Sequence, residues 1–338
     1  MSKFVKKALT FRASSIGDAL MGKYFLENIH AKFPEAICGL LVGSRGKMLR
    51  ELFSAYPWLE VWEVNRRNPF SILRAIRRFF RSDFTLIQYS ENKFSAPSKF
   101  FARLLTKRGG LAGFEDGWKF NKLIYDKILP FAGEYKSPGL ITEERDALFS
   151  LGVSAQVKNF SLDFKEDKGV LKKFGLQKDG YIILHFFSGS DSRGLHFLKR
   201  REILKAVYGR FWKNYELVLT GSESERGMAV KIAEVAPVKV AAGETSMTEL
   251  VNLISNSKVV LSLDTGVAHI AGHLQKSLVV LSRCKAFSAW WSPLMYQKNV
   301  SVLCDRAACG GHHAGKFPKC LNEIGTNLIL SEISKYAG

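Results

Sequence analysis

Cysteine is scarce in this sequence, acidic residues are in short supply, and long apolar runs are missing. Five cysteines, an odd number, are spread over 338 residues, which argues against a disulfide framework. No apolar run approaches the roughly 20 residues of a membrane span, and the start MSKFVKKALTFR has too short an apolar stretch for a signal peptide. We therefore expect a cytoplasmic protein. Internal repeats and low-complexity segments are also lacking.

The shortage of acidic residues leaves a large positive charge. Lys and Arg number 50 against 31 Asp and Glu, a net charge of +19. Such an excess implies an anionic partner: nucleic acid, an acidic membrane surface or a phosphorylated glycolipid. Residues 1–160 carry 26 basic and 15 acidic side chains, a net +11, and the remainder carries +8, so the charge is not a detachable tail. No recognisable nucleic-acid module is present, and we expect no nucleic-acid partner.

Strand-like and helix-like patterns alternate along the whole chain, which predicts an α/β fold with two doubly wound parallel sheets. A hydrophobic content of 46% suits two globular domains. The stretch VSAQVKNFSLDFKEDKG has no clear period and is the predicted linker. The expected domains are residues 1–160 and 170–325. The expected strands cover residues 4–11, 37–42, 59–64, 84–89, 111–114, 181–187, 216–220, 238–241, 259–263 and 278–281.

Residues 258–281, KVVLSLDTGVAHIAGHLQKSLVVL, read as strand, sharp turn, short helix and strand. Asp264 and Thr265 are good helix N-caps, and Gly266 lets a ligand approach the backbone. A helix N-terminus at the end of a parallel strand offers N–H groups to an anion such as a diphosphate. The alternative is one more strand–helix turn of an α/β sheet. The wording DTGVAHIA, together with SSIGD at residues 14–18, resembles the heptosyltransferase family, glycosyltransferase family 9.

The resemblance implies the GT-B architecture, in which two doubly wound domains face a cleft and a final helix, here 326–338, returns to the first domain. It also implies an inverting glycosyltransferase that moves a heptose from an ADP-linked donor to the inner core of lipopolysaccharide. Neither a cofactor nor a metal is expected. The expected partners are the nucleotide sugar, an anionic glycolipid acceptor and the inner face of the bacterial inner membrane. Alternatives are another nucleotide sugar, a protein acceptor, or a basic nucleic-acid-binding protein.

Three segments of the second half carry the expected donor site. SGSDSRG offers small residues whose N–H groups can cradle phosphate and a fixed charge on Arg193; it lacks the Gly-Lys-Ser/Thr ending of a P-loop NTPase. In TGSESE, Glu223 resembles the family's nucleotide-contacting acid, or is a capping acid. His269 faces the diphosphate, or is an interior histidine. The expected donor-binding residues are Ser188, Ser190, Arg193, Glu223, Asp264, Thr265, Gly266 and His269.

Asp18 is the candidate catalytic residue. It ends SSIGD at the start of a helical pattern, where an Asp is commonly an N-cap. The resemblance implies instead a general base, since one carboxylate must accept the proton of the acceptor hydroxyl as it attacks the sugar.

The segment NPFSILRAIRRFFRSD predicts a helix with a basic face. Arg74, Arg77, Arg78 and Arg81 fall at i, i+3, i+4 and i+7, and no Glu occurs between Arg66 and Ser82. We expect this face to bind phosphates, on lipid or on the acceptor's sugars.

Late in the chain lie Cys304, Cys309, Cys320, His312 and His313. Cys and His are ligands of zinc and iron, but the spacing is not that of a standard zinc finger. A reduced structural loop is the favoured interpretation, and metal binding by Cys304, Cys309 and Cys320 the alternative.

Overall fold

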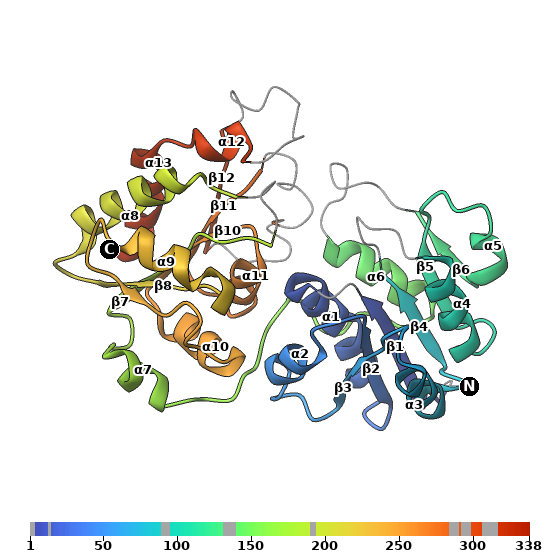
Figure 1. Cartoon of the computed structure of the whole chain (residues 1–338). Helices are drawn as coiled ribbons and strands as arrows, with labels where there is room; N and C mark the ends of the chain where they lie inside the picture. The colour runs from blue at the N-terminus through green and yellow to red at the C-terminus, as the bar shows by residue number, and fades with distance from the viewer. Residues whose placement is uncertain are drawn as a thin grey trace. The chain divides into compact units, whose positions relative to one another are not determined.

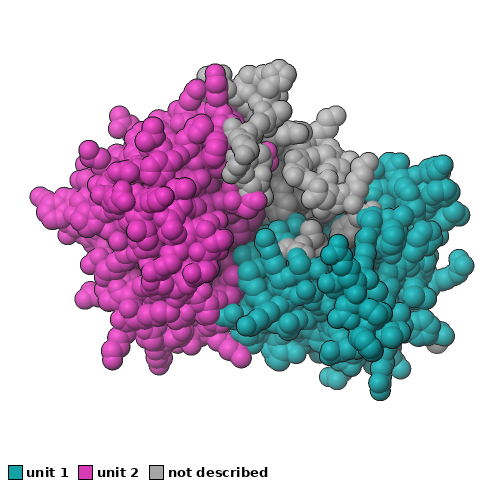
Figure 2. Space-filling view, viewed as in Figure 1, with its two compact units in different colours: residues 1–160 teal, residues 161–338 magenta. Residues whose placement is uncertain are grey.

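The computed structural model describes residues 4–12, 15–88, 95–130, 140–189, 194–283, 291, 299–305 and 317–338. Over these residues the chain divides into two compact units, Met1–Phe160 and Ser161–Gly338 (Figure 2). Each unit contains a six-stranded parallel sheet. The predicted α/β class with two doubly wound parallel sheets is therefore confirmed. The first unit has the bounds of the predicted N-terminal domain.

The first unit is built around β1, which lies inside a sheet of order β3-β2-β1-β4-β5-β6 (Figure 1). Its inner strands are buried on both faces because helices cover both sides of a parallel sheet. The strands are β1 (Lys7–Arg12), β2 (Ile37–Val42), β3 (Leu59–Glu63), β4 (Phe84–Ile87), β5 (Leu111–Phe114) and β6 (Lys127–Leu129). The helices are α1 (Ile16–Lys32), α2 (Gly46–Leu52), α3 (Pro69–Phe79), α4 (Ala96–Leu105), α5 (Asn121–Ile124) and α6 (Leu140–Ser150).

Two helical layers cover this sheet. One core joins Leu9, Phe11 and Leu41 of the sheet to Phe79 of α3, Ala102 of α4 and Ile124 of α5. Helices α1 and α6 pack against each other, and Arg145 of α6 donates to the Tyr24 hydroxyl of α1 at 3.1 Å. Right-handed crossovers require this division, since the chain reverses its direction across the sheet after β3.

The second unit has a sheet of order β12-β11-β10-β7-β8-β9. The strands are β7 (Tyr181–His185), β8 (Glu216–Leu219), β9 (Lys239–Val240), β10 (Val259–Leu263), β11 (Leu278–Leu281) and β12 (Val300–Leu303). The helical elements are α7 (Gly169–Phe174), α8 (Phe197–Phe211), η2 (Glu223–Glu225), α9 (Arg226–Ala233), α10 (Met247–Asn256), α11 (Gly266–His273), α12 (Lys319–Asn322) and α13 (Thr326–Ala337). Among the described residues, no helix is long and apolar enough to cross a bilayer.

The final helix differs from the expectation of a return to the first domain. Helix α13 belongs to the second unit, where Ile329, Ile333 and Ala337 lie in the same buried core as α8 and β10. Tyr215 also donates a hydrogen bond to the Ala337 carbonyl. The apolar stripe of α13 is thus used within the second unit.

Candidate functional site

In the second unit, the sequence-predicted donor residues follow strands that meet at a topological switch point. Strands β7 and β10 are neighbours, and the sheet grows outward from this pair in opposite directions. Ligands of open α/β sheets bind at such a point, outside the carboxyl ends of the strands. His185 pairs with Ser262 in the register, so the loops carrying Ser188 and Asp264 leave the sheet at the same level.

The turn after β10 is held by side chains that contact Asp264. The Trp291 indole N–H donates to Asp264 Oδ1 at 3.1 Å, and the Ser282 hydroxyl donates to Asp264 Oδ2 at 3.3 Å. His269 Nε2 lies 3.6 Å from Asp264 Oδ1. The His269 ring is buried and stacks on Trp291 with centroids 4.8 Å apart. Asp264 and His269 therefore form an internal cluster that fixes the turn.

The start of α11 is suited to an anion. Thr265 is the N-cap in an extended conformation, and its own side chain makes no capping hydrogen bond. The N–H groups of a helix's first turn have no partner within the helix and can donate to oxygen atoms of a ligand. The cluster of Asp264, His269 and Trp291 positions this helix start, which makes His269 a positioning residue in the geometry observed.

Glu223 is not the capping acid, which was one of the two roles that the sequence allowed for it. The 3₁₀ turn η2 has Ser222 as N-cap and Glu225 as the reciprocal capping acid, with the Ser222 N–H donating to Glu225 Oε2 at 2.7 Å. Glu223 is exposed and its carboxylate lies over Gly243, where a Cβ would be 2.4 Å from Glu223 Oε2. Gly243 has φ +74°, so it combines a left-handed conformation with a close approach. Ser190 and Arg193 lie outside the described residues.

In the first unit, Asp18 lies at the topological switch point of the sheet. Strands β1 and β4 flank the switch point of this sheet, and Asp18 lies in the first turn of the helix that follows β1. Ser15 is the N-cap: its hydroxyl accepts from the Asp18 N–H at 3.1 Å and donates to Asp18 Oδ2 at 2.6 Å. Asp18 is therefore not the N-cap, and its half-buried carboxylate stands at the positive end of α1.

The basic face of α3 is smaller than the spacing predicted. The helix ends at Phe79, and Arg81 lies beyond it with φ +60°, so placing Arg81 on the helical face was wrong. Arg78 is engaged by Glu60 of β3, to which its Nε donates at 3.1 Å. Burial raises the pKa of Glu60, but the hydrogen bonds from Arg78 and Trp62 outweigh it and hold that pKa below its usual value.

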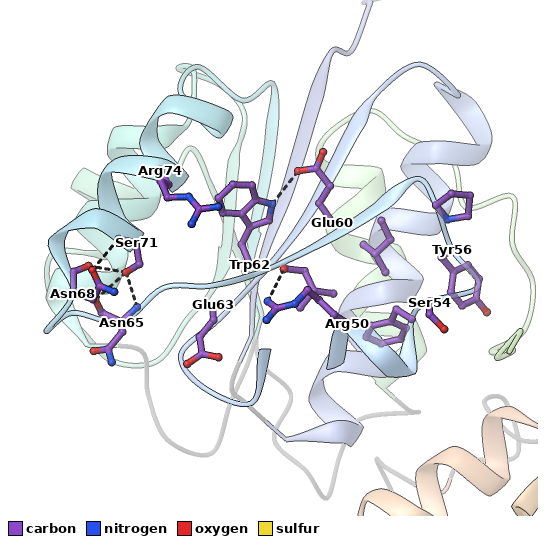
Figure 3. A pocket seen from close by; sticks show the side chains of 14 residues that line it. Arg50, Ser54, Tyr56, Glu60, Trp62, Glu63, Asn65, Asn68, Ser71 and Arg74 are labelled. Atoms are coloured by element: carbon purple, nitrogen blue, oxygen red, sulfur yellow. Dashed lines mark hydrogen bonds between the residues drawn. The ribbon is translucent and has the colours of Figure 1, made fainter. Parts of the chain in front are cut away.

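Arg74 and Arg77 remain exposed on α3. The Arg74 guanidinium lies 5.6 Å from the ring centroid of Trp62. Arg74 and Trp62 line a hollow of about 780 Å³ beside the edge strand β3 (Figure 3). Tyr56, Asn65 and Asn68 also contribute to its walls. The hollow combines an aromatic ring, amides and a cation with the carboxylates of Glu60 and Glu63. Such a lining can bind sugar hydroxyls, and Arg74 offers the cation for a phosphate.

Of the late cysteines, Cys304 and Cys320 are described, and Cys309 is not. Cys320 is buried, and its carbonyl accepts from the Asp305 N–H at 2.8 Å. Within the part of the chain that the structure describes, no three Cys, His, Asp or Glu side chains form a metal-binding group.

His185, which the sequence did not single out, is a buried polar residue at the end of β7. Its Nδ1 lies 3.0 Å from the Thr220 hydroxyl at the end of β8. Burial lowers the pKa of His185 to about 4, against about 6.5 in the unfolded chain.

Acid should therefore destabilise the protein partly through His185. Below pH 6.5 the unfolded chain binds a proton there while the folded chain does so only near pH 4. This lowers the free energy of unfolding by about 1.4 kcal/mol per pH unit in that window. Denaturant unfolding from pH 7 to 4.5 should show a shallower decline for His185→Gln than for wild type. The exposed His196→Gln serves as control, and parallel profiles for His185→Gln and wild type would contradict the assignment.

One family model and several solved structures match the chain. Residues 154–306 match the family model glycosyltransferase family 9 (heptosyltransferase). No curated protein matches the chain significantly. Among solved structures, a glycosyl transferase family 9 protein from Veillonella parvula matches with TM-score 0.76 and 13% identity, covering 100% of this chain and 98% of the other.

Two E. coli enzymes match over nearly their whole length. ADP-heptose lps heptosyltransferase II gives TM-score 0.72 at 16% identity, with 98% of each chain covered. Heptosyltransferase WaaC with ADP-2-deoxy-2-fluoro heptose gives 0.68 at 18% identity, with 97% of this chain and 99% of that chain covered. At these identities the structural matches establish the shared fold.

Proposed function

Through residues 154–306 the chain belongs to glycosyltransferase family 9 (heptosyltransferase), and from this premise we propose that it transfers a heptose from an ADP-linked donor to the inner core of lipopolysaccharide. The acceptor is then an anionic glycolipid, reached from the inner face of the bacterial inner membrane. The heptose and the ADP are supported by the E. coli structures named above, whose descriptions include ADP-heptose and its fluoro analogue.

The reaction is a single displacement with inversion. An acceptor hydroxyl oxygen forms a bond to the anomeric carbon of the donor while the bond from that carbon to the β-phosphate oxygen breaks. Asp18 accepts the hydroxyl proton as general base, and ADP leaves with the electron pair. The N–H groups at the start of α11 and the charge of Arg193 stabilise the developing negative charge on the diphosphate. Glu223 accepts hydrogen bonds from the ribose hydroxyls.

The placement of DTG and SSIGD at the two switch points carries this proposal most directly. Each motif follows a central strand and opens a helix, α11 and α1 respectively. Structural matching on its own would be equally compatible with a nucleotide-binding protein that has no activity. Incubation with ADP-heptose and a phosphorylated core oligosaccharide should release ADP and yield a product one heptose heavier. ADP release with a different nucleotide sugar alone would reject heptose as the donor sugar.

Arg74 and Arg77 of α3, which have no acidic partner among the described residues, should act on the acceptor. Replacing Arg74 and Arg77 with Ser should raise the KM for a water-soluble phosphorylated acceptor several-fold while leaving the donor KM unchanged. Each lost cation–phosphate contact weakens acceptor binding. Because salt screens the same contacts in the wild type, high salt should reduce the difference in acceptor KM between the variant and the wild type. Lys205→Ser with Arg210→Ser, on exposed positions of α8, is the control. An unchanged acceptor KM at low salt would contradict a role of α3 in acceptor binding.

A further inference from the structure

Helices α3, α4 and α5 form one layer on one face of the first unit's sheet (Figure 1). Neighbouring members of the layer are tied together. Arg66, just before α3, donates to the Ser98 hydroxyl of α4 at 2.8 Å. Phe100 of α4 contacts Trp118 edge-on at 6.1 Å, and Trp118 contacts Phe120 at 5.5 Å, next to α5. The outer side of this layer is therefore a continuous surface.

This outer side carries large apolar side chains that point away from the core. At helical spacing, Phe70 and Leu73 lie opposite the buried Ala75 and Phe79 of α3. Six such residues, with exposed fractions of 43% to 76%, define the outer face: Phe70, Leu73, Phe100, Leu104, Phe120 and Leu123. Among the described residues of α1, α2 and α6 on the other helical layer, only Phe149 is a comparably exposed apolar side chain.

The segment that contains this layer holds much of the positive charge. Residues 66–127 contain 14 basic and 5 acidic residues, a net charge of +9 out of +19. Three of the acids are neutralised by ion pairs: Lys107–Asp83 at 2.5 Å, Lys99–Asp116 at 2.6 Å and Arg103–Asp126 at 2.7 Å. Exposed cations without an acidic partner in the described structure include Arg77, Arg108 and Lys122. Exposed cations and exposed large apolar side chains thus occur on the same segment of the chain.

We propose that the outer face of α3, α4 and α5 docks onto an anionic lipid bilayer. Phe and Leu side chains enter the boundary between headgroups and acyl chains, and Arg and Lys contact lipid phosphates. The long basic side chains can reach back to the phosphates while their stems stay among the lipids. A nucleic acid would satisfy the charge but would leave six large apolar side chains in water. This proposal rests on the proposed transfer to a glycolipid, because an enzyme with such an acceptor must reach the membrane surface.

Co-sedimentation with vesicles tests the docking without any sugar transfer. The full chain should bind vesicles of phosphatidylethanolamine with phosphatidylglycerol and bind poorly to pure phosphatidylcholine, with binding reduced by salt. Replacing Phe70, Leu73, Phe100 and Leu104 with Ser should lower the partition coefficient at least tenfold. Phe149→Ser, an equally exposed residue on α6 of the other layer, should partition as wild type. Thermal melting of each variant verifies that it is folded.

Wild-type failure to bind the anionic vesicles would overturn the proposal, as would unchanged partitioning of the folded four-residue variant. Binding to duplex RNA with higher affinity than to the vesicles, insensitive to the four substitutions, would also overturn it. Transfer to a water-soluble acceptor separates this proposal from the enzymatic one. The four-residue variant should keep wild-type transfer there, since Arg74 and Arg77 are intact. If the wild type binds vesicles but transfers no sugar, the proposed reaction is rejected and the proposed membrane docking is not.

Discussion

Asp18→Asn should lower the rate of sugar transfer by about a hundred- to ten-thousand-fold, the range typical of a lost general base. The carboxylate is half-buried in the first turn of α1, where the helix N-terminus favours its negative charge. An amide of the same shape cannot accept the proton of the attacking hydroxyl. The loss should therefore fall on kcat at saturating concentrations of both substrates.

The fold should hardly change in this variant. Ser15 remains the N-cap that accepts from the residue 18 N–H, and the Asn oxygen can still accept from the Ser15 hydroxyl. The stability difference should stay within about 1 kcal/mol. Stabilisation by ADP should also persist, because the proposed donor residues all belong to the second unit. Asp146→Asn, an exposed acid on α6, is the matched control and should keep full activity. If Asp18→Asn retains more than about a tenth of wild-type activity, Asp18 is not the general base and only stabilises the start of α1.

The central strands could be predicted from the sequence because each is buried on both faces and reads as an apolar run. The edge strands β6 and β12 could not. They are short and partly exposed, so their sequences lack the apolar signal of a covered strand. Helix α4 was missed for another reason. Its buried side includes Lys99, whose Nζ is held by Asp116 and Asn121, and a lysine at a core position breaks the apolar period that marks a helix.

The candidate site was predictable where its residues are adjacent in sequence and less so where distant residues meet. The turn containing Asp264 could be predicted directly from the sequence. The hydrogen bond from Trp291, 27 residues away, to Asp264 gave no sequence signal. The same limit applied to Arg78: a scan of the helix finds no acid nearby, but Glu60 reaches it from β3. Such pairs follow from the strand order of the sheet, which residue spacing along one segment does not contain.

ADP should stabilise the wild-type protein, and the double substitution Arg193→Ala with His269→Ala should remove most of that effect. At a concentration about 100 times Kd, ADP adds about 2.7 kcal/mol to the folded state. For a unit of this size that corresponds to a rise of roughly 5 to 10 °C in the melting temperature. Loss of His269 removes the ring that stacks on Trp291 and lies beside Asp264, so the start of α11 is no longer held. Loss of Arg193 would remove the cation that we propose to meet the diphosphate.

The shift must be measured against each variant's own melting temperature without ligand, because removing a buried ring destabilises the fold by itself. The control pairs His30→Ala with Arg210→Ala. His30 stacks on Trp58 in the first unit with centroids 4.7 Å apart, nearly the geometry of His269 on Trp291, and Arg210 is exposed on α8. This control should lose stability and keep the full ADP shift. Equal ADP shifts in wild type and in the Arg193, His269 double variant would place the diphosphate elsewhere, and the start of α11 would then be a structural turn.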